Sequence, residues 1–337
     1  MNKLLSFILF FLLFSFSHAQ VSDFKKINFA KANSIAHSNK GKDLNDLPLL
    51  AYNLTNELTT DVEKFRAIYI WVCSNIESDY YYSLKNISKR KKYQNDSIKL
   101  IQWNENFKKI SFERLLKKKK AICTGYAYLI KELANLSNIE CEIINGFGIL
   151  ESQINSKTHF PNHSWNAVKL NNKWYLCDAT WSAGLYNLDT KTFDFNYNDG
   201  YFLTEPEWFS KNHFPIDKSW FLYATNLTVD QFYKAPLIYN NAFNEKVFPV
   251  VPEIMRIETT INTVINFVLQ KPEYVSINSV SLNTYSVNDF KIVTPKIEID
   301  SNGLIKFKHS FEKKGNYDVH IIANNKIIGT YVVKVKS

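Results

Sequence analysis

The sequence predicts an α+β core, in which helices pack on an antiparallel sheet, followed by a separate β-sandwich domain. Two changes in hydrophobic period along the 337 residues indicate this organisation. Apolar residues recur at helical spacing up to about residue 134, and strand-like runs follow from about residue 141. From about residue 245, short alternating runs separated by Asn-Gly and Asn-Asn pairs are typical of a β-sandwich.

The N-terminal 19 residues have the pattern of a secretory signal peptide. Lys3 precedes an apolar stretch over residues 4–16, and Ser17-His18-Ala19 forms a small-residue cleavage site. The apolar stretch is shorter than the roughly 20 residues that span a bilayer. We therefore expect export to the periplasm, the cell surface or the medium, with no transmembrane span once the signal is removed.

Helices are expected first along the mature chain. Residues 61–76 carry an apolar stripe, and Thr60 with Glu63 forms a capping box at its start. Residues 24–58 show a weaker helical pattern. Residues 83–106 are polar and basic, and we expect them to form a loop or an irregular insertion.

Strands and one further helix follow. The second helix is expected from Cys123 to about Ala134, and the first strand over residues 141–148. Two more strands, at 163–170 and 173–180, are joined by Asn171-Asn172, and Asn suits a two-residue hairpin turn because it tolerates positive φ.

Cys123 is the first candidate for chemistry. A helix N-terminus favours thiolate, and a thiolate nucleophile needs an imidazole and a third group that orients it. His163 and Asp178 can supply both. If the hairpin turn has two residues, Asp178 stands opposite Trp165, so His163 and Asp178 are diagonal neighbours on one face of the sheet.

The same residues leave some alternatives open. The backbone N–H of Cys123 is a natural oxyanion donor, whereas its side-chain partner stays unassigned, with residues 102–104 as candidates. Cys123, His163 and Asp178 are also zinc-ligand types, but they lack the close spacing usual in zinc sites, so we expect no metal and no cofactor. Four cysteines are too few for a disulfide scaffold, and a Cys141–Cys177 bridge stays open.

The chain is strongly basic, which raises the question of an acidic partner. The formal net charge is +9, concentrated in Lys89-Arg90-Lys91-Lys92 and Lys117-Lys118-Lys119-Lys120. We interpret both runs as solvated surface, while contact with a cell surface or an anionic polymer stays open. Nucleic acid is not expected as a partner, because no nucleic-acid-binding motif accompanies the charge.

These motifs resemble the transglutaminase-like superfamily, a papain-like group of cysteine acyl-transfer enzymes, and most of all its kyphoscoliosis peptidase and cytokinesis-protein branch. The similar stretches are the helix at 61–72, the nucleophile motif at 120–128, the histidine motif at 163–168, the aspartate motif at 174–181, and segments at 201–206 and 213–215. The resemblance implies Cys123 as nucleophile, with His163 and Asp178 as its partners. The family usually has Gly two residues before the cysteine, where this chain has Ala121.

The resemblance also implies a domain plan. It consists of a signal peptide at 1–19, an N-terminal helical part at 20–110 with a basic insertion at about 85–109, a transglutaminase-like core at 111–243, and an immunoglobulin-like β-sandwich at 244–337.

The implied function is that of an exported cysteine peptidase or amide hydrolase that acts on a protein or peptide through a thioester. Tyr126, Trp165 and Trp181 are expected to line the acyl site. Two alternatives remain, a cross-linking acyl transferase and a non-catalytic binding or scaffold protein that keeps the fold.

Overall fold

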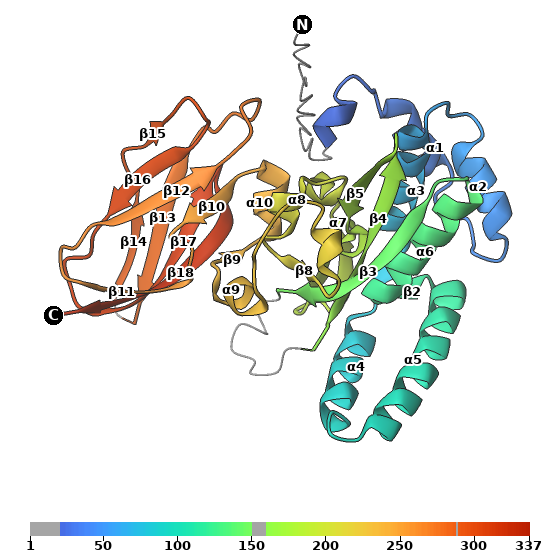
Figure 1. Cartoon of the computed structure of the whole chain (residues 1–337), viewed down its shortest axis with the longest axis horizontal. Coiled ribbons are helices and arrows are strands. Elements are labelled where there is room, and N and C mark those ends of the chain that lie inside the picture. Colours follow the sequence, from blue (N-terminus) through green and yellow to red (C-terminus); the bar gives the residue numbers. More distant parts are fainter. Residues whose placement is uncertain (1–20, 150–159, 288) are drawn as a thin grey trace, which may run out of the picture.

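Figure 1 shows the computed structural model, which describes residues 21–149, 160–287 and 289–337. A mixed helix-and-sheet domain lies beside a β-sandwich, and a pair of helices projects from the first domain. The expected signal peptide lies outside the described residues. Within the part of the chain that the structure describes, no helix combines the length and the apolar character that crossing a membrane requires.

The N-terminal segment forms helices, as the sequence predicts. Their order is η1 (Val21–Phe24), α1 (Ala30–Ser38), α2 (Leu47–Thr55) and α3 (Asp61–Asn75). The predicted capping box is confirmed, because the Thr60 side chain accepts from the Glu63 backbone N–H while the Glu63 carboxylate accepts from Thr60. α3 is buried on most sides and forms the centre of the helical layer.

The predicted loop over residues 83–106 was wrong. This segment forms a helical hairpin of α4 (Tyr80–Lys92) and α5 (Ser97–Lys118), joined at its base by the short parallel strands β1 (Glu77–Ser78) and β2 (Lys120–Ala121). Asp79 and Asp96 cap the two helices, and the rings of Tyr82 and Phe107 stack at 4.5 Å between them. A few local contacts thus hold two largely polar helices whose hydrophobic pattern is weak.

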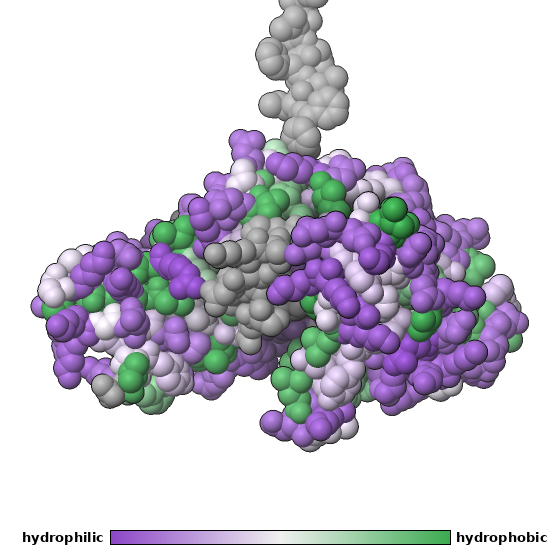
Figure 2. All heavy atoms as spheres, turned by 90° about the horizontal axis from the view of Figure 1, so that it is seen from below, coloured by the Kyte–Doolittle hydropathy of each residue, from purple (hydrophilic) through white to green (hydrophobic). Residues whose placement is uncertain are grey.

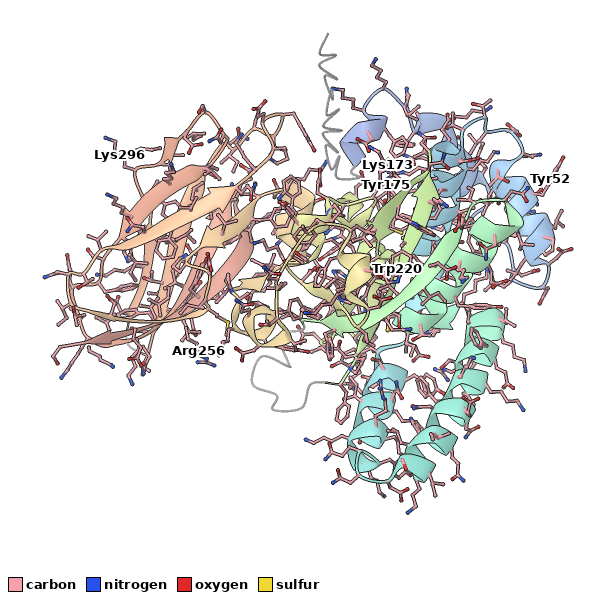
Figure 3. All side chains as sticks on the ribbon, in the orientation of Figure 1. Tyr52, Lys173, Tyr175, Trp220, Arg256 and Lys296 are labelled. Carbon is pink, nitrogen blue, oxygen red and sulfur yellow. The ribbon has the colours of Figure 1, made fainter. Side chains whose placement is uncertain are left out.

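The central sheet is antiparallel, with strands in the order β5-β4-β3-β8. Its members are β3 (Cys141–Gly148), β4 (His163–Leu170), β5 (Lys173–Cys177) and β8 (His213–Pro215). α6 (Cys123–Leu136) and α3 pack on one face (Figure 1). Figure 3 shows Lys173 and Tyr175 of β5 beside the N-terminal segment, where Asp23 accepts hydrogen bonds from both side chains.

The hairpin between β4 and β5 has the predicted turn and register. Asn171 and Asn172 have φ of 49° and 61°, and Leu170 pairs with Lys173. The second strand is shorter than predicted. It ends at Cys177, because Asp178 accepts hydrogen bonds from the next backbone N–H groups and starts the short helix α7 (Ala179–Ala183).

The remaining elements of the first domain lead to the second domain. They are β6 (Gly184–Asn187), β7 (Thr192–Phe195), η3 (Asp199–Tyr201), α8 (Pro206–Phe209), η4 (Lys218–Phe221), α9 (Val229–Lys234), β9 (Leu237–Ile238) and α10 (Asn240–Glu245). Residues of η3, α8 and α10 among them pack on the face of the sheet that carries Trp165 and Leu176. One buried cluster runs from this face into the second domain, with Trp208 stacked on Phe248 at a centroid distance of 5.1 Å.

The second domain is the predicted β-sandwich (Figure 1). One sheet has the order β10-β12-β16-β15, and the other has the order β11-β18-β17-β13-β14 with β9 paired to β18. The strands are β10 (Phe248–Val251), β11 (Arg256–Thr260), β12 (Ile265–Gln270), β13 (Val280–Ser286), β14 (Asp289–Val293), β15 (Glu298–Ile299), β16 (Ile305–His309), β17 (Gly315–Ala323) and β18 (Lys326–Lys336).

Candidate active site

Cys123 differs from the other three cysteines. It is the first residue of α6 and is partly exposed, whereas Cys73, Cys141 and Cys177 are buried. All four thiols are free, so the Cys141–Cys177 bridge left open by the sequence is not formed. Burial raises the pKa of each of the three buried thiols and keeps them protonated and inert.

The structure brings Cys123, His163 and Asp178 together. His163 begins β4, and Asp178 is the residue that follows β5, so the hairpin turn sets their relative positions. Nε2 of His163 lies 2.7 Å from Oδ2 of Asp178, and the same imidazole is hydrogen-bonded to Cys123. Because Asp178 occupies Nε2, Nδ1 is the ring nitrogen that remains for the thiol.

The electrostatics of the three groups favour an ion pair. Burial alone would raise the pKa of the Cys123 thiol, but the hydrogen bond and the charge of His163 outweigh it and lower that pKa. Burial opposes protonation of His163, whereas the adjacent Asp178 and then Cys123 raise the pKa of the imidazole to about 10. Both shifts favour a thiolate beside an imidazolium.

Asp178 is held by more than one partner. It is fully buried, and its Oδ1 accepts from the backbone N–H groups of Thr180 and Trp181. Its Oδ2 also accepts from Nε2 of His213 at 3.1 Å. Burial would raise the pKa of this carboxyl, but the charge of His163 and the hydrogen bonds from both histidines lower it.

His213 was not predicted as a site residue. Its segment entered the sequence argument only as part of the family resemblance. Burial lowers its pKa to about 4, and the charge of His163 adds to this effect. His213 is therefore a neutral imidazole at pH 7, and it stands behind the carboxylate that orients His163.

His163, Asp178 and His213 are also types of residue that bind metals. Their ligand atoms lie within 4.8 Å of one another. The direct hydrogen bonds to Oδ2 already occupy Nε2 of both histidines, so an ion at this position would have to displace them. The arrangement fits an orienting network better than a metal centre, and the expectation of no metal stays a prediction.

A cavity of about 650 Å³ opens beside Cys123. One wall is α4 of the helical hairpin, and the opposite wall comes from β3, β4 and the segment before β4. The described residues that line it combine polar and apolar side chains, and they include Asn86, Ile87, Arg90, Asn145, Asn162, His163 and Ser164. α4, which the sequence did not predict as a helix, thus forms part of the site.

The three aromatic residues expected in the acyl site lie elsewhere than in the described wall of this cavity. Tyr126 is buried and its hydroxyl donates to the carbonyl of Ile76. Trp165 of β4 is buried in the core that lies against the sheet, and Trp181 stacks on the imidazole of His163 with centroids 4.5 Å apart. They support the site by packing around it.

The structure also shows where the candidate oxyanion donors at 102–104 and the methyl group of Ala121 lie. Gln102 and Asn104 are exposed on α5 and do not line the cavity, while Trp103 between them donates to Oδ1 of Asn86, which does. Ala121 is buried, and its methyl group faces Gly125, where an added Cβ would lie 2.8 Å away. The methyl group therefore points into the core and not toward the approach to Cys123.

Part of this chain is similar to known proteins. Residues 49–179 match the family model of the transglutaminase-like superfamily. The chain is 32% identical to the human (Homo sapiens) kyphoscoliosis peptidase over 214 residues, which is 62% of this chain and 29% of that protein. Hillarin of Drosophila melanogaster is 24% identical over 226 residues, or 63% of this chain and 25% of that protein. The chain thus spans less than a third of the length of these curated relatives.

Solved structures give weaker matches. One described as "Crystal structure of a TGase" is 15% identical with a TM-score of 0.29, and covers 54% of this chain and 40% of that one. A Lin-41 filamin domain is 16% identical with a TM-score of 0.22, and covers 30% of this chain and 97% of that one. The family match and the curated relatives together show that this chain carries a transglutaminase-like domain, consistent with the kyphoscoliosis peptidase branch.

Proposed function

We propose that this protein is an exported cysteine enzyme that cleaves an amide bond in a protein or peptide through a thioester on Cys123. The observation that carries the proposal is the continuous contact from Cys123 through His163 to Asp178 at the wall of an open cavity. Acyl transfer by a cysteine requires a thiol with a lowered pKa and an oriented imidazole beside it.

Each of these residues has its own role in the proposed reaction. The Cys123 thiolate attacks the carbonyl carbon, and the negative charge on the oxygen is stabilised by the backbone N–H of Cys123 at the start of α6. Nδ1–H of His163 then gives its proton to the departing amine, and the C–N bond breaks to leave a thioester. Water attacks the thioester while His163 accepts its proton, and the acid leaves as the thiolate is restored.

The fate of the thioester separates hydrolysis from cross-linking. An amine in place of water gives a new amide, through the same intermediate and the same residues. We favour hydrolysis because water is abundant in the exported location that the signal-like N-terminus suggests. A scaffold without turnover is the third reading, and it gives no reason for a partly exposed thiol with a lowered pKa.

Thiol labelling tests the proposal first. At pH 5–6, iodoacetamide should modify Cys123 selectively, because only its thiolate is populated there, and His163→Ala should abolish that selectivity. Cys123→Ser is the control for the site of labelling. Equal inertness of all four cysteines would contradict the catalytic proposal. Release of ammonia or of new N-termini from a panel of peptides would then separate amide hydrolysis from peptide cleavage.

A further inference from the structure

The described wall of the cavity beside Cys123 is positively charged. Arg90 and Lys91 of α4 line it, and none of its described lining residues is Asp or Glu. Apart from His163, the polar groups of the opposite wall are neutral, among them Asn145, Asn162 and Ser164. Figure 2 shows that hydrophilic residues cover most of the face seen from below, so basic residues on the outer surface are unremarkable, whereas a cation in the cavity wall needs a reason.

Arg90 differs from the other arginines of the first domain. Arg66 pairs with Asp199 and Arg114 pairs with Asp79. Arg90 is half-buried, and its Nη1 donates to the carbonyl of Pro161 at 3.0 Å. Among the described residues no carboxylate pairs with it, although a guanidinium carries five donors.

Burial without a counter-ion is costly for a guanidinium. Burial lowers the pKa of Arg90, and the charge of Cys123 acts in the opposite direction, which places the guanidinium within electrostatic reach of the thiolate. A cation kept in this position has its remaining donors available for a ligand in the cavity. A planar guanidinium binds a carboxylate through two parallel hydrogen bonds, so a carboxylate is the group that fits best.

We infer that this cavity selects acyl donors that carry a carboxylate near the reacting carbonyl, and that Arg90 receives this carboxylate. The inference rests on the proposed function, since it concerns the substrate of the same thiol. Leu84, Ile87 and Phe160 lie in the same cavity, so an acidic peptide with a neighbouring apolar side chain matches the wall most completely. Arg90 is then a specificity-determining residue.

A pair of nearly isosteric reagents tests this inference. Iodoacetate and iodoacetamide both alkylate the thiolate and differ in a carboxylate against an amide, and each rate is divided by its rate with a small free thiol. We expect the corrected iodoacetate-to-iodoacetamide ratio at Cys123 to be well above one, and Arg90→Gln to lower it about tenfold. Any change in the thiolate population affects both reagents alike and cancels in the ratio.

The matched controls lie on the same helix. Lys92→Gln removes the same charge from an exposed position outside the cavity and should change the ratio less than twofold, because exposed charges are screened by salt. Arg90→Lys keeps the charge without the planar fork and should retain part of the preference. Circular dichroism of each variant checks that α4 is intact.

The outcomes separate the two proposals. If neither reagent modifies Cys123 faster than the free thiol, the proposed function fails. If iodoacetamide reacts rapidly but the ratio is near one, or is the same in wild type and Arg90→Gln, the enzyme proposal stands and the carboxylate preference is overturned. An equal fall in Lys92→Gln would show a general field of the basic helix and would likewise overturn the role of Arg90.

Discussion

The neutral state of His213 predicts a particular dependence of stability on pH. Its pKa falls from an ordinary value of 6.5 to about 4 because the imidazole is buried. Between these two values the unfolded chain binds a proton that the native protein does not, so stability falls as the pH falls from 6.5 to 4. The difference corresponds to about 3 kcal/mol in the free energy of unfolding.

The partners of His213 titrate outside this window. The pKa of His163 is raised to about 10, so its contribution is complete below pH 6.5 and is lost only as the pH rises toward 10. The pKa of Asp178 is lowered, so its contribution is lost only below the ordinary range of an aspartate. Wild type and a His213 variant should therefore differ in how much unfolding free energy they lose between pH 6.5 and 4, and we assign that difference to His213.

Equilibrium unfolding in urea measures this loss. All seven tryptophans precede β10, so their fluorescence reports mainly the first domain, with Trp208 also in contact with Phe248 of the sandwich. His213→Gln keeps an N–H donor for Asp178 but does not titrate. We expect wild type to lose about 3 kcal/mol more than this variant between pH 6.5 and 4. Equal losses in both proteins, or a larger loss in the variant, would refute the assignment of His213 as a buried neutral imidazole.

Two other substitutions probe the orientation of His163. Asp178→Asn removes the charge that raises the pKa of the imidazole, so the pH midpoint of Cys123 labelling should shift upward and turnover should fall by at least about a hundredfold; an unchanged labelling profile would argue against the ion pair. Gly148→Ala would place a Cβ 3.0 Å from Trp181 and 3.1 Å from Cβ of His163, so we expect about 1–3 kcal/mol of destabilisation and slower labelling of Cys123, and wild-type values for both would show that the indole and imidazole stack can yield.

The part of the site that rests on local sequence signals was predictable. The turn at Asn171-Asn172 fixes the register of β4 and β5, and register fixes the face on which His163 and Asp178 meet. The helix that begins at Cys123 follows from its apolar spacing. These relationships span few residues and depend on backbone geometry, which is why the sequence suffices for them.

The second histidine on Asp178 was not predictable in the same way. His213 comes from β8, which joins the sheet at the edge beyond β3, and five short elements without a regular period separate β5 from that strand. Strand register read from the sequence therefore does not relate the position of residue 213 to that of residue 178. The position of a side chain that arrives through such a connection is decided by packing, here against Phe209 with ring centroids 3.8 Å apart, and packing is not visible in a single sequence.

The cavity wall formed by α4 was missed for a different reason. Six residues of α4 line the cavity, at intervals of one to three positions that place them on one side of the helix: Ser83, Leu84, Asn86, Ile87, Arg90 and Lys91. Only Leu84 and Ile87 are apolar, so a search for a hydrophobic period does not detect the face, and Arg90 lies within a run of four basic residues. A helix face that lines a solvent-filled site is selected for contact with a ligand and not for burial. A helix that faces a substrate is expected to carry both polar and apolar residues on that face, and this mixture is why the sequence did not predict α4. The same mixture is consistent with Arg90 facing the cavity while Lys92 faces the solvent.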